Sequence, residues 1–155
     1  MNQPKTAALL LCFTVAACAA AQTNNAPAQP VSYTSISELN QIIAGLEGAS
    51  QATQLDLARL RIEKWKTDSN TKKQTQSDTE SIARNLQNAL PGMLNELKNS
   101  PESLRLTFKL YRNLDALYDV MNSLVESAGA FGGKEEFQTL NKDLENIESS
   151  RRAFA

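Results

Sequence analysis

Apolar side chains recur every three or four residues in four successive segments of this chain, and this spacing is the feature that most limits its fold. The segments span residues 36–64, 82–97, 104–128 and 137–154. Such spacing places side chains on one face of an α-helix, whereas a strand would require alternation with a period of two. The sequence therefore predicts an all-α protein. Short turns between the segments favour a four-helix, up-down-up-down bundle over residues 35–155.

The first helix is expected to begin at Ser35, because Ser35 and Glu38 have the spacing of a capping box. Its predicted inward stripe is Ile36, Leu39, Ile43, Leu46, Ser50, Thr53, Leu57, Leu60 and Lys64. The 3-4 phase, typical also of coiled coils, continues through Gly45 and Gly48. We therefore expect one long helix from residue 36 to about residue 66.

Residues 66–81 hold no large apolar side chain and leave two alternatives. They could form a polar loop that ends at a capping box of Ser77 and Glu80, or a solvated helix that begins near Asp68 or Ser69. Folding the chain back about residue 68 places the small Ser50 and Thr53 opposite large side chains of the second segment. This complementarity favours the helix.

Pro91 lies inside the second segment, where proline removes a backbone donor and clashes with the carbonyl of Gln87. A kink or local opening is expected between Gln87 and Gly92. The same fold about residue 68 sets Pro91 level with Gly45. We therefore predict that Gly45 leaves room for the displaced backbone.

The third helix is expected to start at Ser100, with Pro101 in its first turn, and to end near Ala128. One apolar row and a second row beside it form a wide arc: Leu110, Leu114, Leu117, Met121, Leu124 and Ala128, flanked by Leu104, Phe108, Tyr111, Tyr118 and Val125. This helix should be the most buried. The fourth helix has its stripe at Phe137, Leu140, Leu144, Ile147, Arg151 and Phe154.

Residue types limit the chemistry that such a bundle can perform. The chain has no histidine, and its two cysteines, Cys12 and Cys18, lie near the amino terminus. Di-iron bundles need Glu-x-x-His pairs, and haem needs a histidine, a thiolate or an attachment pair. Spacings typical of calcium loops, phosphate loops and serine triads are missing too. We expect no metal, no cofactor and no catalytic residue.

Arg112, Asp115 and Asp119 share one face of the third helix, with Tyr111 and Tyr118 at its edge. Carboxylates and tyrosines at this spacing could form a small polar site. Helical neighbours of opposite charge more often form a solvated, ion-paired face, and this is our interpretation.

Charge is distributed unevenly although the net charge is only −1, which gives no basic bias for nucleic acid. Residues 59–73 hold a basic cluster of Arg59, Arg61, Lys64, Lys66, Lys72 and Lys73 against two acidic side chains. The fourth helix is acidic from Glu135 to Glu148. In an up-down bundle the two regions meet at one end, where they could be complementary to each other. Alternatively, the basic cluster is a contact patch for anionic lipid, polysaccharide or a partner.

Residues 1–21 have the pattern of a signal peptide, because Lys5 precedes an uncharged run from Ala7 to Ala21. The strongly apolar part covers about 11 residues, whereas a transmembrane helix needs about 20. Two processing positions remain open. Val15 to Cys18 resembles the lipobox of bacterial lipoproteins, in which Cys18 would be lipidated, and the small residues up to Ala21 suit ordinary cleavage before Gln22.

Residues 22–34 are polar and contain two prolines, which predicts a disordered tether between the signal and the bundle. We therefore expect an exported, non-enzymatic protein of the periplasm or cell envelope, either soluble or lipid-anchored through Cys18. Such a protein would act by surface contact with a protein partner or envelope component. The alternative is a small-ligand carrier or enzyme with a carboxylate or tyrosine site inside the bundle.

Overall fold

The computed structural model describes residues 33–155, so the predicted signal peptide, Cys18 and most of the predicted tether lie outside the described residues. The described chain is all-helical. Its elements are α1 (Tyr33–Leu57), a 3₁₀ turn η1 (Ile62–Lys64), α2 (Ser69–Arg84), a π-helical turn η2 (Asn85–Ala89), α3 (Leu90–Asn99), α4 (Leu104–Phe131) and α5 (Lys134–Ala153).

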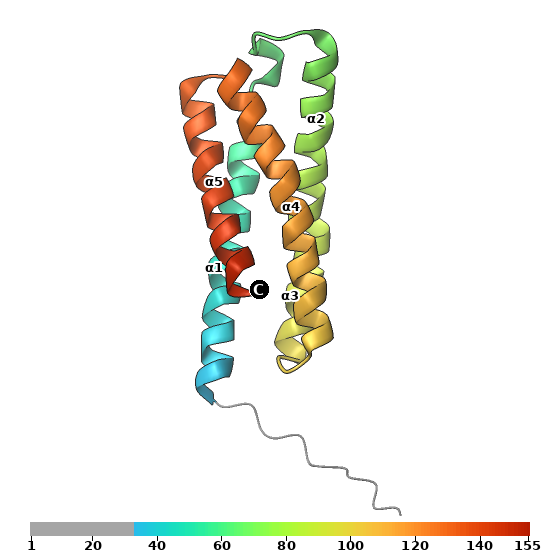
Figure 1. Cartoon of the computed structure of the whole chain (residues 1–155), viewed down its shortest axis with the longest axis vertical. Helices are drawn as coiled ribbons and strands as arrows, with labels where there is room; N and C mark the ends of the chain where they lie inside the picture. The colour runs from blue at the N-terminus through green and yellow to red at the C-terminus, as the bar shows by residue number, and fades with distance from the viewer. Residues whose placement is uncertain (1–32) are drawn as a thin grey trace, which may run out of the picture. The chain divides into compact units, whose positions relative to one another are not determined.

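Because α2, η2 and α3 follow one another without a break, the elements form four antiparallel helical rods (Figure 1). The helix α5 packs extensively against both α4 and α1, while α2 and α3 pack against α4. Contacts between α1 and the α2–α3 rod are fewer. The four-helix antiparallel bundle predicted from apolar spacing is thus confirmed. The most extensive helix contacts are those of α5 with α4 and with α1, rather than those of α1 with α2.

The core is one apolar cluster to which every rod contributes. The predicted row of the third helix, from Leu110 to Ala128, is buried throughout. Ser50 and Thr53 of α1 are also buried, and so is Thr75 of α2. Ser50 lines a hollow together with Leu86, as predicted, whereas Thr53 faces Asp143 of α5 instead of the second segment. Ser50 and Thr53 interrupt the apolar stripe of α1 at its middle with small polar side chains.

The first helix ends at Leu57, about two turns before the predicted end near residue 66. Beyond it the chain turns inward, and Ile62 and Trp65 become 5% and 4% exposed. Trp65 packs closely against Gly132. A Cβ atom added at Gly132 would lie 3.1 Å from the indole and 2.8 Å from the Ala128 carbonyl oxygen. Burial of this indole at the end of the bundle explains why the chain leaves the helical path. The prediction for residues 58–66 was therefore wrong.

Of the two alternatives for residues 66–81, the helix is confirmed. It begins at Ser69, and the Asp68 carboxylate accepts hydrogen bonds from the backbone N–H groups of Asn70 at 2.8 Å and Thr71 at 3.0 Å. These bonds satisfy two of the orphan donors at the helix start. They also lower the pKa of Asp68 to about 2, together with the Thr71 hydroxyl, which contributes most.

The expected disturbance before Pro91 is present as the π-helical turn η2. In this turn the Leu90 N–H donates to Asn85 O, and Pro91 has no N–H, so neither is a backbone donor for the Leu86 carbonyl. The side-chain amide of Gln54 on α1 donates to that carbonyl instead, at 3.4 Å. The opening at Pro91 is therefore bridged from the neighbouring helix.

The predicted packing role of Gly45 was wrong. A Cβ at Gly45 or at Gly48 would meet no atom within 4 Å, because both glycines lie on the outer side of α1. Pro91 instead lines a hollow together with Glu47 and Gln54. The α2–α3 rod is therefore displaced along α1 by about one turn from the pairing that a fold about residue 68 predicts.

The start of α4 also differs from the prediction. The helix begins at Leu104 after Ser103, and Ser100 and Pro101 form the preceding turn. Leu104 and Phe108, expected in the apolar arc, are 85% and 64% exposed. The helix α5 ends at Ala153 and does not extend over this first part of α4, which leaves both side chains uncovered.

Candidate functional site

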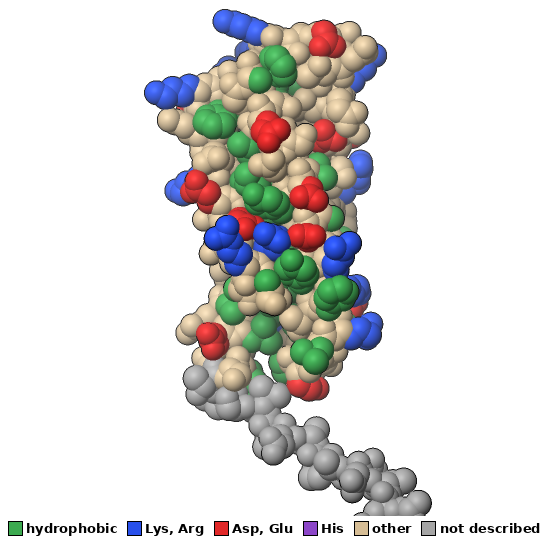
Figure 2. All heavy atoms as spheres, viewed as in Figure 1, with side chains coloured by type: hydrophobic (Ala, Val, Ile, Leu, Met, Phe, Trp, Pro, Cys, Tyr) green, Lys and Arg blue, Asp and Glu red, His purple; other side chains and the backbone are tan. Residues whose placement is uncertain are grey.

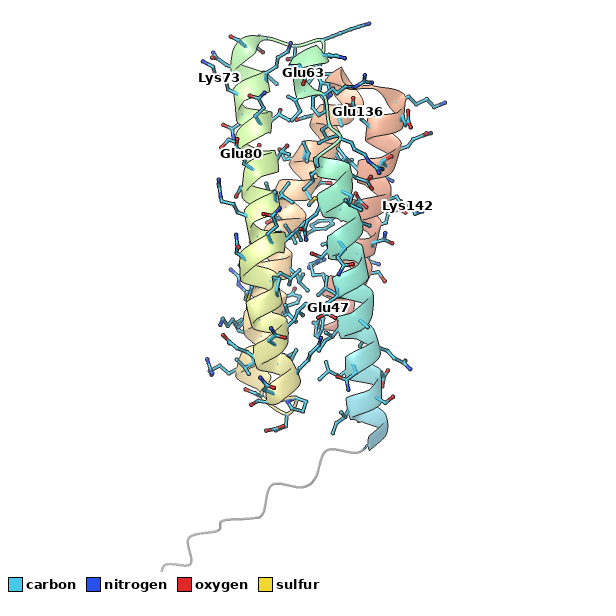
Figure 3. All side chains as sticks on the ribbon, turned by 180° about the vertical axis from the view of Figure 1, so that it is seen from behind. Glu47, Glu63, Lys73, Glu80, Glu136 and Lys142 are labelled. Carbon is cyan, nitrogen blue, oxygen red and sulfur yellow. The ribbon has the colours of Figure 1, made fainter. Side chains whose placement is uncertain are left out.

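The predicted basic cluster gathers at one end of the bundle, where the chain leaves α1 and enters α2. Figure 2 shows blue side chains projecting from this end, and Figure 3 labels Lys73 there, near Glu63 and Glu136. We call this group the basic tip, defined by Arg59, Arg61, Lys64, Lys66, Lys72 and Lys73. All but the half-buried Lys72 are exposed.

Two side chains of the basic tip, those of Arg59 and Lys72, are bonded to neighbouring groups, and Arg61 is bonded through its backbone. Arg59 forms an ion pair with Asp56 at 3.4 Å, and Lys72 Nζ donates to the Glu63 carbonyl oxygen at 2.9 Å. The Arg61 backbone N–H donates to Glu136 Oε1 at 2.9 Å. Lys64, Lys66 and Lys73 form no ion pair with any residue of the 33–155 range. These three lysines are unpaired charges of the tip, and the Arg61 guanidinium likewise forms no ion pair within the described residues.

Glu136 at the start of α5 fastens the loop that carries the tip. Its carboxylate accepts hydrogen bonds from Arg61 N, from the Trp65 indole at 3.0 Å and from Gly133 N at 2.9 Å. Burial acts to raise the pKa of Glu136, but these bonds outweigh it and hold the pKa below its usual value. The loop is thus joined to the start of α5 by backbone and indole donors, and among the basic side chains of the tip Arg61 acts on Glu136 through its charge, which also lowers the pKa of Glu136.

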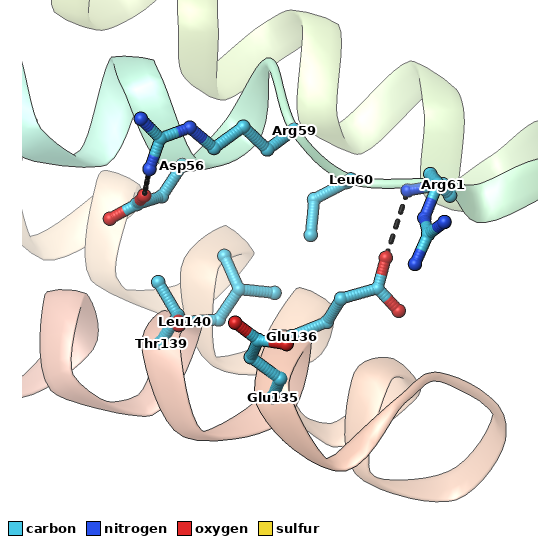
Figure 4. A pocket seen from close by; sticks show the side chains of 8 residues that line it. All are labelled: Asp56, Arg59, Leu60, Arg61, Glu135, Glu136, Thr139 and Leu140. Carbon is cyan, nitrogen blue, oxygen red and sulfur yellow. Dashed lines mark hydrogen bonds and ion pairs between the residues drawn. The ribbon is translucent and has the colours of Figure 1, made fainter.

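A hollow of about 270 Å³ lies between the end of α1 and the start of α5 (Figure 4). Its polar lining comes from Asp56, Arg59, Arg61, Glu135 and Glu136. Asp56 is paired with Arg59, and Glu136 with the Arg61 backbone, so two of its three carboxylates already have partners. Three carboxylates against two guanidinium groups give the hollow a lining of mixed sign with a net charge of −1.

Asp143 of α5 is an ionisable group at the α1–α5 interface and is only 4% exposed. Burial, aided by the nearby Asp56 carboxylate, raises the pKa of Asp143 to about 6. Thr53 faces it from α1 and acts to lower this pKa, although Asp143 Oδ2 and Thr53 Oγ1 have no partner within ordinary hydrogen-bond geometry in the described chain. A carboxyl group with this pKa suits proton transfer, but the surrounding helices keep it from contact with a substrate.

The polar face predicted on α4 extends across to α5. Arg151 forms a two-point ion pair with Glu148, at 2.6 and 3.0 Å, and binds Asp115 Oδ1 at 2.9 Å. Its guanidinium lies 5.1 Å from the centre of the Tyr118 ring. Hydrogen bonding by Arg151 lowers the pKa of Glu148 to about 2. This half-buried network joins α4 to α5.

Of the three residues predicted to share this face, the structure brings two together, since Arg112 pairs with Asp115 at 3.5 Å. Asp119 remains exposed and forms no ion pair within residues 33–155. The partners contributed by α5 were not predicted, although Arg151 occupies a position in the predicted stripe. Trp65 and the burial of Asp143 were also missed. Asp143 lies between Leu140 and Leu144 in the sequence, and this was the available signal.

Comparisons with known proteins gave no match, so a function can be argued only from the fold and from these sites. No known family, curated protein or solved structure matches the chain. Within residues 33–155, no group of three or more metal-binding side chains could hold an ion. No helix of that range has both the length and the apolar character required to span a bilayer.

Proposed function

We propose that this chain is an exported, non-enzymatic bundle of the bacterial cell envelope whose basic tip binds an anionic envelope component. The observation that carries the proposal is the group of three exposed lysines, Lys64, Lys66 and Lys73, at one end of the bundle and without an ion pair in the described chain. Unpaired cations close together attract an anionic surface and accelerate association with it.

The place of the tip in the fold supports this function. The helix α1 runs from Tyr33 to Leu57, about 37 Å at 1.5 Å per residue, and the tip begins just beyond its end. Glu136 and the buried Trp65 hold the loop against α5, so the lysines project from a fixed base. A basic surface on a rigid base is suited to binding, and the predicted signal peptide would deliver it to the envelope.

Binding to anionic polysaccharide and to vesicles that contain an anionic phospholipid tests the proposal. The variant with Lys64, Lys66 and Lys73 all changed to Gln should bind at least 10-fold more weakly than the wild type. Binding by the wild type should also fall as salt rises. A matched control changes Arg84, Arg105 and Lys142 to Gln, which removes the same charge from exposed positions away from the tip.

The two triple variants separate a local site from general charge. Retained binding by the control together with loss in the tip variant supports a site at the tip. Equal loss in both variants, or no binding by the wild type to either material, would overturn the proposal. Preference for polysaccharide over vesicles identifies which of the two anionic components the tip recognises.

A small-ligand carrier or enzyme remains the second candidate, and the hollow beside Asp56 and Glu135 is the observation that favours it. A ligand there should protect the protein against thermal unfolding, and Glu135→Gln should weaken that protection. The tip variant described above should leave such protection unchanged, which distinguishes this function from binding at the tip.

A further inference from the structure

A second hollow lies within the basic tip itself, where the loop around η1 meets the turn between α4 and α5. Its volume is about 300 Å³. This volume is at the lower limit of small-molecule sites, so the hollow suits a small group rather than an acyl chain or a protein segment. We call it the tip hollow, defined by its charged lining, Arg61, Lys64, Lys66 and Glu136, and its aromatic lining, Trp65 and Phe131.

The lining of the tip hollow has a net positive charge. Three basic side chains against one carboxylate give a net charge of +2. Lys64, Lys66 and the Arg61 guanidinium form no ion pair within residues 33–155, so all three charges are open to a ligand. The hollow between α1 and α5 differs in this respect, because its lining has a net charge of −1.

Charges next to the lining do not reverse this sign. The charged residues adjacent to it in the chain but outside it are Glu63, Lys134 and Glu135. Together these three add one negative charge, so the surroundings of the hollow remain positive. The other two lysines of this end, Lys72 and Lys73, are basic as well and belong to the tip but not to the lining.

Backbone donors around the tip hollow are already used within the chain. Glu136 accepts the three N–H donors described above. The Lys66 N–H donates to the Phe131 carbonyl oxygen at 3.1 Å and joins the loop to the end of α4. These bonds fix the base of the hollow and occupy its one carboxylate. The cationic side chains are left as the groups that bind a ligand.

We propose that the tip hollow binds a phosphomonoester group, the terminal phosphate of a phosphorylated sugar or of a lipid headgroup. Such a group carries about −1.5 to −2 charges at pH 7 and three strong acceptor oxygens, which match a lining of +2 with three cationic donors. Lysine and arginine are both ordinary phosphate ligands. A carboxylate or a phosphodiester has only one negative charge to pair. This inference rests on the proposed function, since it names the anionic group that the same tip recognises.

Calorimetric titration of the purified protein with glucose 6-phosphate tests the proposal. Glucuronate is the matched ligand, because it combines a similar sugar ring with a single carboxylate. Glucose 6-phosphate should bind with a dissociation constant on the order of 1 mM, and at least about 5-fold more tightly than glucuronate, because one more charge is paired at the surface. Equal affinity for the two sugars, or no binding of glucose 6-phosphate, would overturn the proposal.

Two double variants locate the site. Lys64→Gln with Lys66→Gln removes two charges from the lining and should weaken the binding of glucose 6-phosphate at least about 10-fold. The matched control, Lys72→Gln with Lys73→Gln, removes the same charge from the tip outside the lining and should keep the affinity within about 2-fold. Circular dichroism should show an unchanged helical fold in both. Equal losses in the two variants would overturn the proposal.

Vesicles distinguish a lipid source of the group from a soluble one. Phosphatidic acid is a lipid phosphomonoester and phosphatidylglycerol a phosphodiester, and each is mixed with phosphatidylcholine to the same surface potential. Preference for phosphatidic acid that is lost in the lining variant supports the proposal with a lipid source. Preference for glucose 6-phosphate over glucuronate without a preference between the vesicles supports it with a saccharide source.

The same measurements separate this inference from the proposed function. Binding to vesicles or polysaccharide through the tip, with no preference for the phosphomonoester in either pair, would overturn the inference and leave the proposed function standing. Binding of glucose 6-phosphate in the hollow, with no binding to vesicles or polysaccharide, would support the inference and overturn the proposed envelope function.

Discussion

Replacement of Asp143 by asparagine should stabilise the bundle at neutral pH. The wild-type carboxylate is buried between α1 and α5, where its pKa is about 6 against an ordinary value of 3.8. Each unit of difference between the folded and the ordinary pKa corresponds to about 1.4 kcal/mol. Ionisation of Asp143 therefore costs the folded state about 3 kcal/mol at neutral pH. Asparagine has nearly the same shape and remains neutral, and its amide can donate toward the unpaired Thr53 hydroxyl.

The pH dependence identifies the mechanism. Because the folded state binds the proton more tightly than the unfolded chain, the stability due to protonated Asp143 is complete below pH 3.8 and is lost as the pH rises through 6. The Asp143→Asn variant and the wild type should therefore have similar free energies of unfolding near pH 3.5. The difference should grow to about 3 kcal/mol in favour of the variant by pH 7.

Urea unfolding between pH 3.5 and 7.5, followed by fluorescence of the sole tryptophan, Trp65, measures this difference. Other carboxylates such as Glu148, whose pKa is lowered to about 2, change stability equally in both proteins and cancel. Asp119→Asn is the matched control, since it removes an exposed carboxylate and should change stability by less than about 0.5 kcal/mol. A difference between variant and wild type that does not vary with pH would refute the reasoning.

Three further predictions follow from the structure, and a fourth follows from the amino-terminal sequence. Leu117→Ala removes a side chain that is 4% exposed and should lower the free energy of unfolding in urea by about 2–5 kcal/mol; a loss below about 0.5 kcal/mol would contradict its burial. Gly45→Ala should raise that free energy by up to about 1 kcal/mol, because Gly45 is helical and open to solvent; a loss of stability would restore its packing role. Trp65→Phe should cost about 1–3 kcal/mol by removing the indole bond to Glu136, and an unchanged urea midpoint, followed by circular dichroism because this variant has no tryptophan, would show that this bond contributes nothing. Mass spectrometry of the protein from its native host should find a lipidated Cys18 or a new amino terminus at Gln22, whereas an intact Met1 would contradict the predicted signal peptide.

The buried faces of the helices could be predicted because apolar spacing is a local property. Leu114, Leu117 and Met121 recur every three or four residues, so an α-helix must place them together whatever they pack against. The disturbance before Pro91 followed from the covalent structure of proline in the same way. The start of α2 was predictable because Asp68 bonds donors only two and three residues further on.

Pairings between helices required the tertiary structure, because they depend on how far one rod is displaced along another. A fold about residue 68 predicted contact between Pro91 and Gly45, but the rods are offset by about one turn and Gly45 faces solvent. Periodicity within a helix carries no information on that displacement. The bond between Gln54 and the Leu86 carbonyl, which bridges the π-helical turn, therefore had no local signal.

The sequence by itself determined the all-helical class, most of the inward face of each rod and the restriction to chemistry without histidine. Only the tertiary structure decided where α1 ends, because burial of Trp65 against Gly132 and its bond to Glu136 outweigh a continuing helical pattern. It also decided that Asp143 is buried and that Leu104 and Phe108 are exposed. Each of these outcomes depends on whether another helix covers the position, and coverage is set by the lengths and offsets of all four rods together.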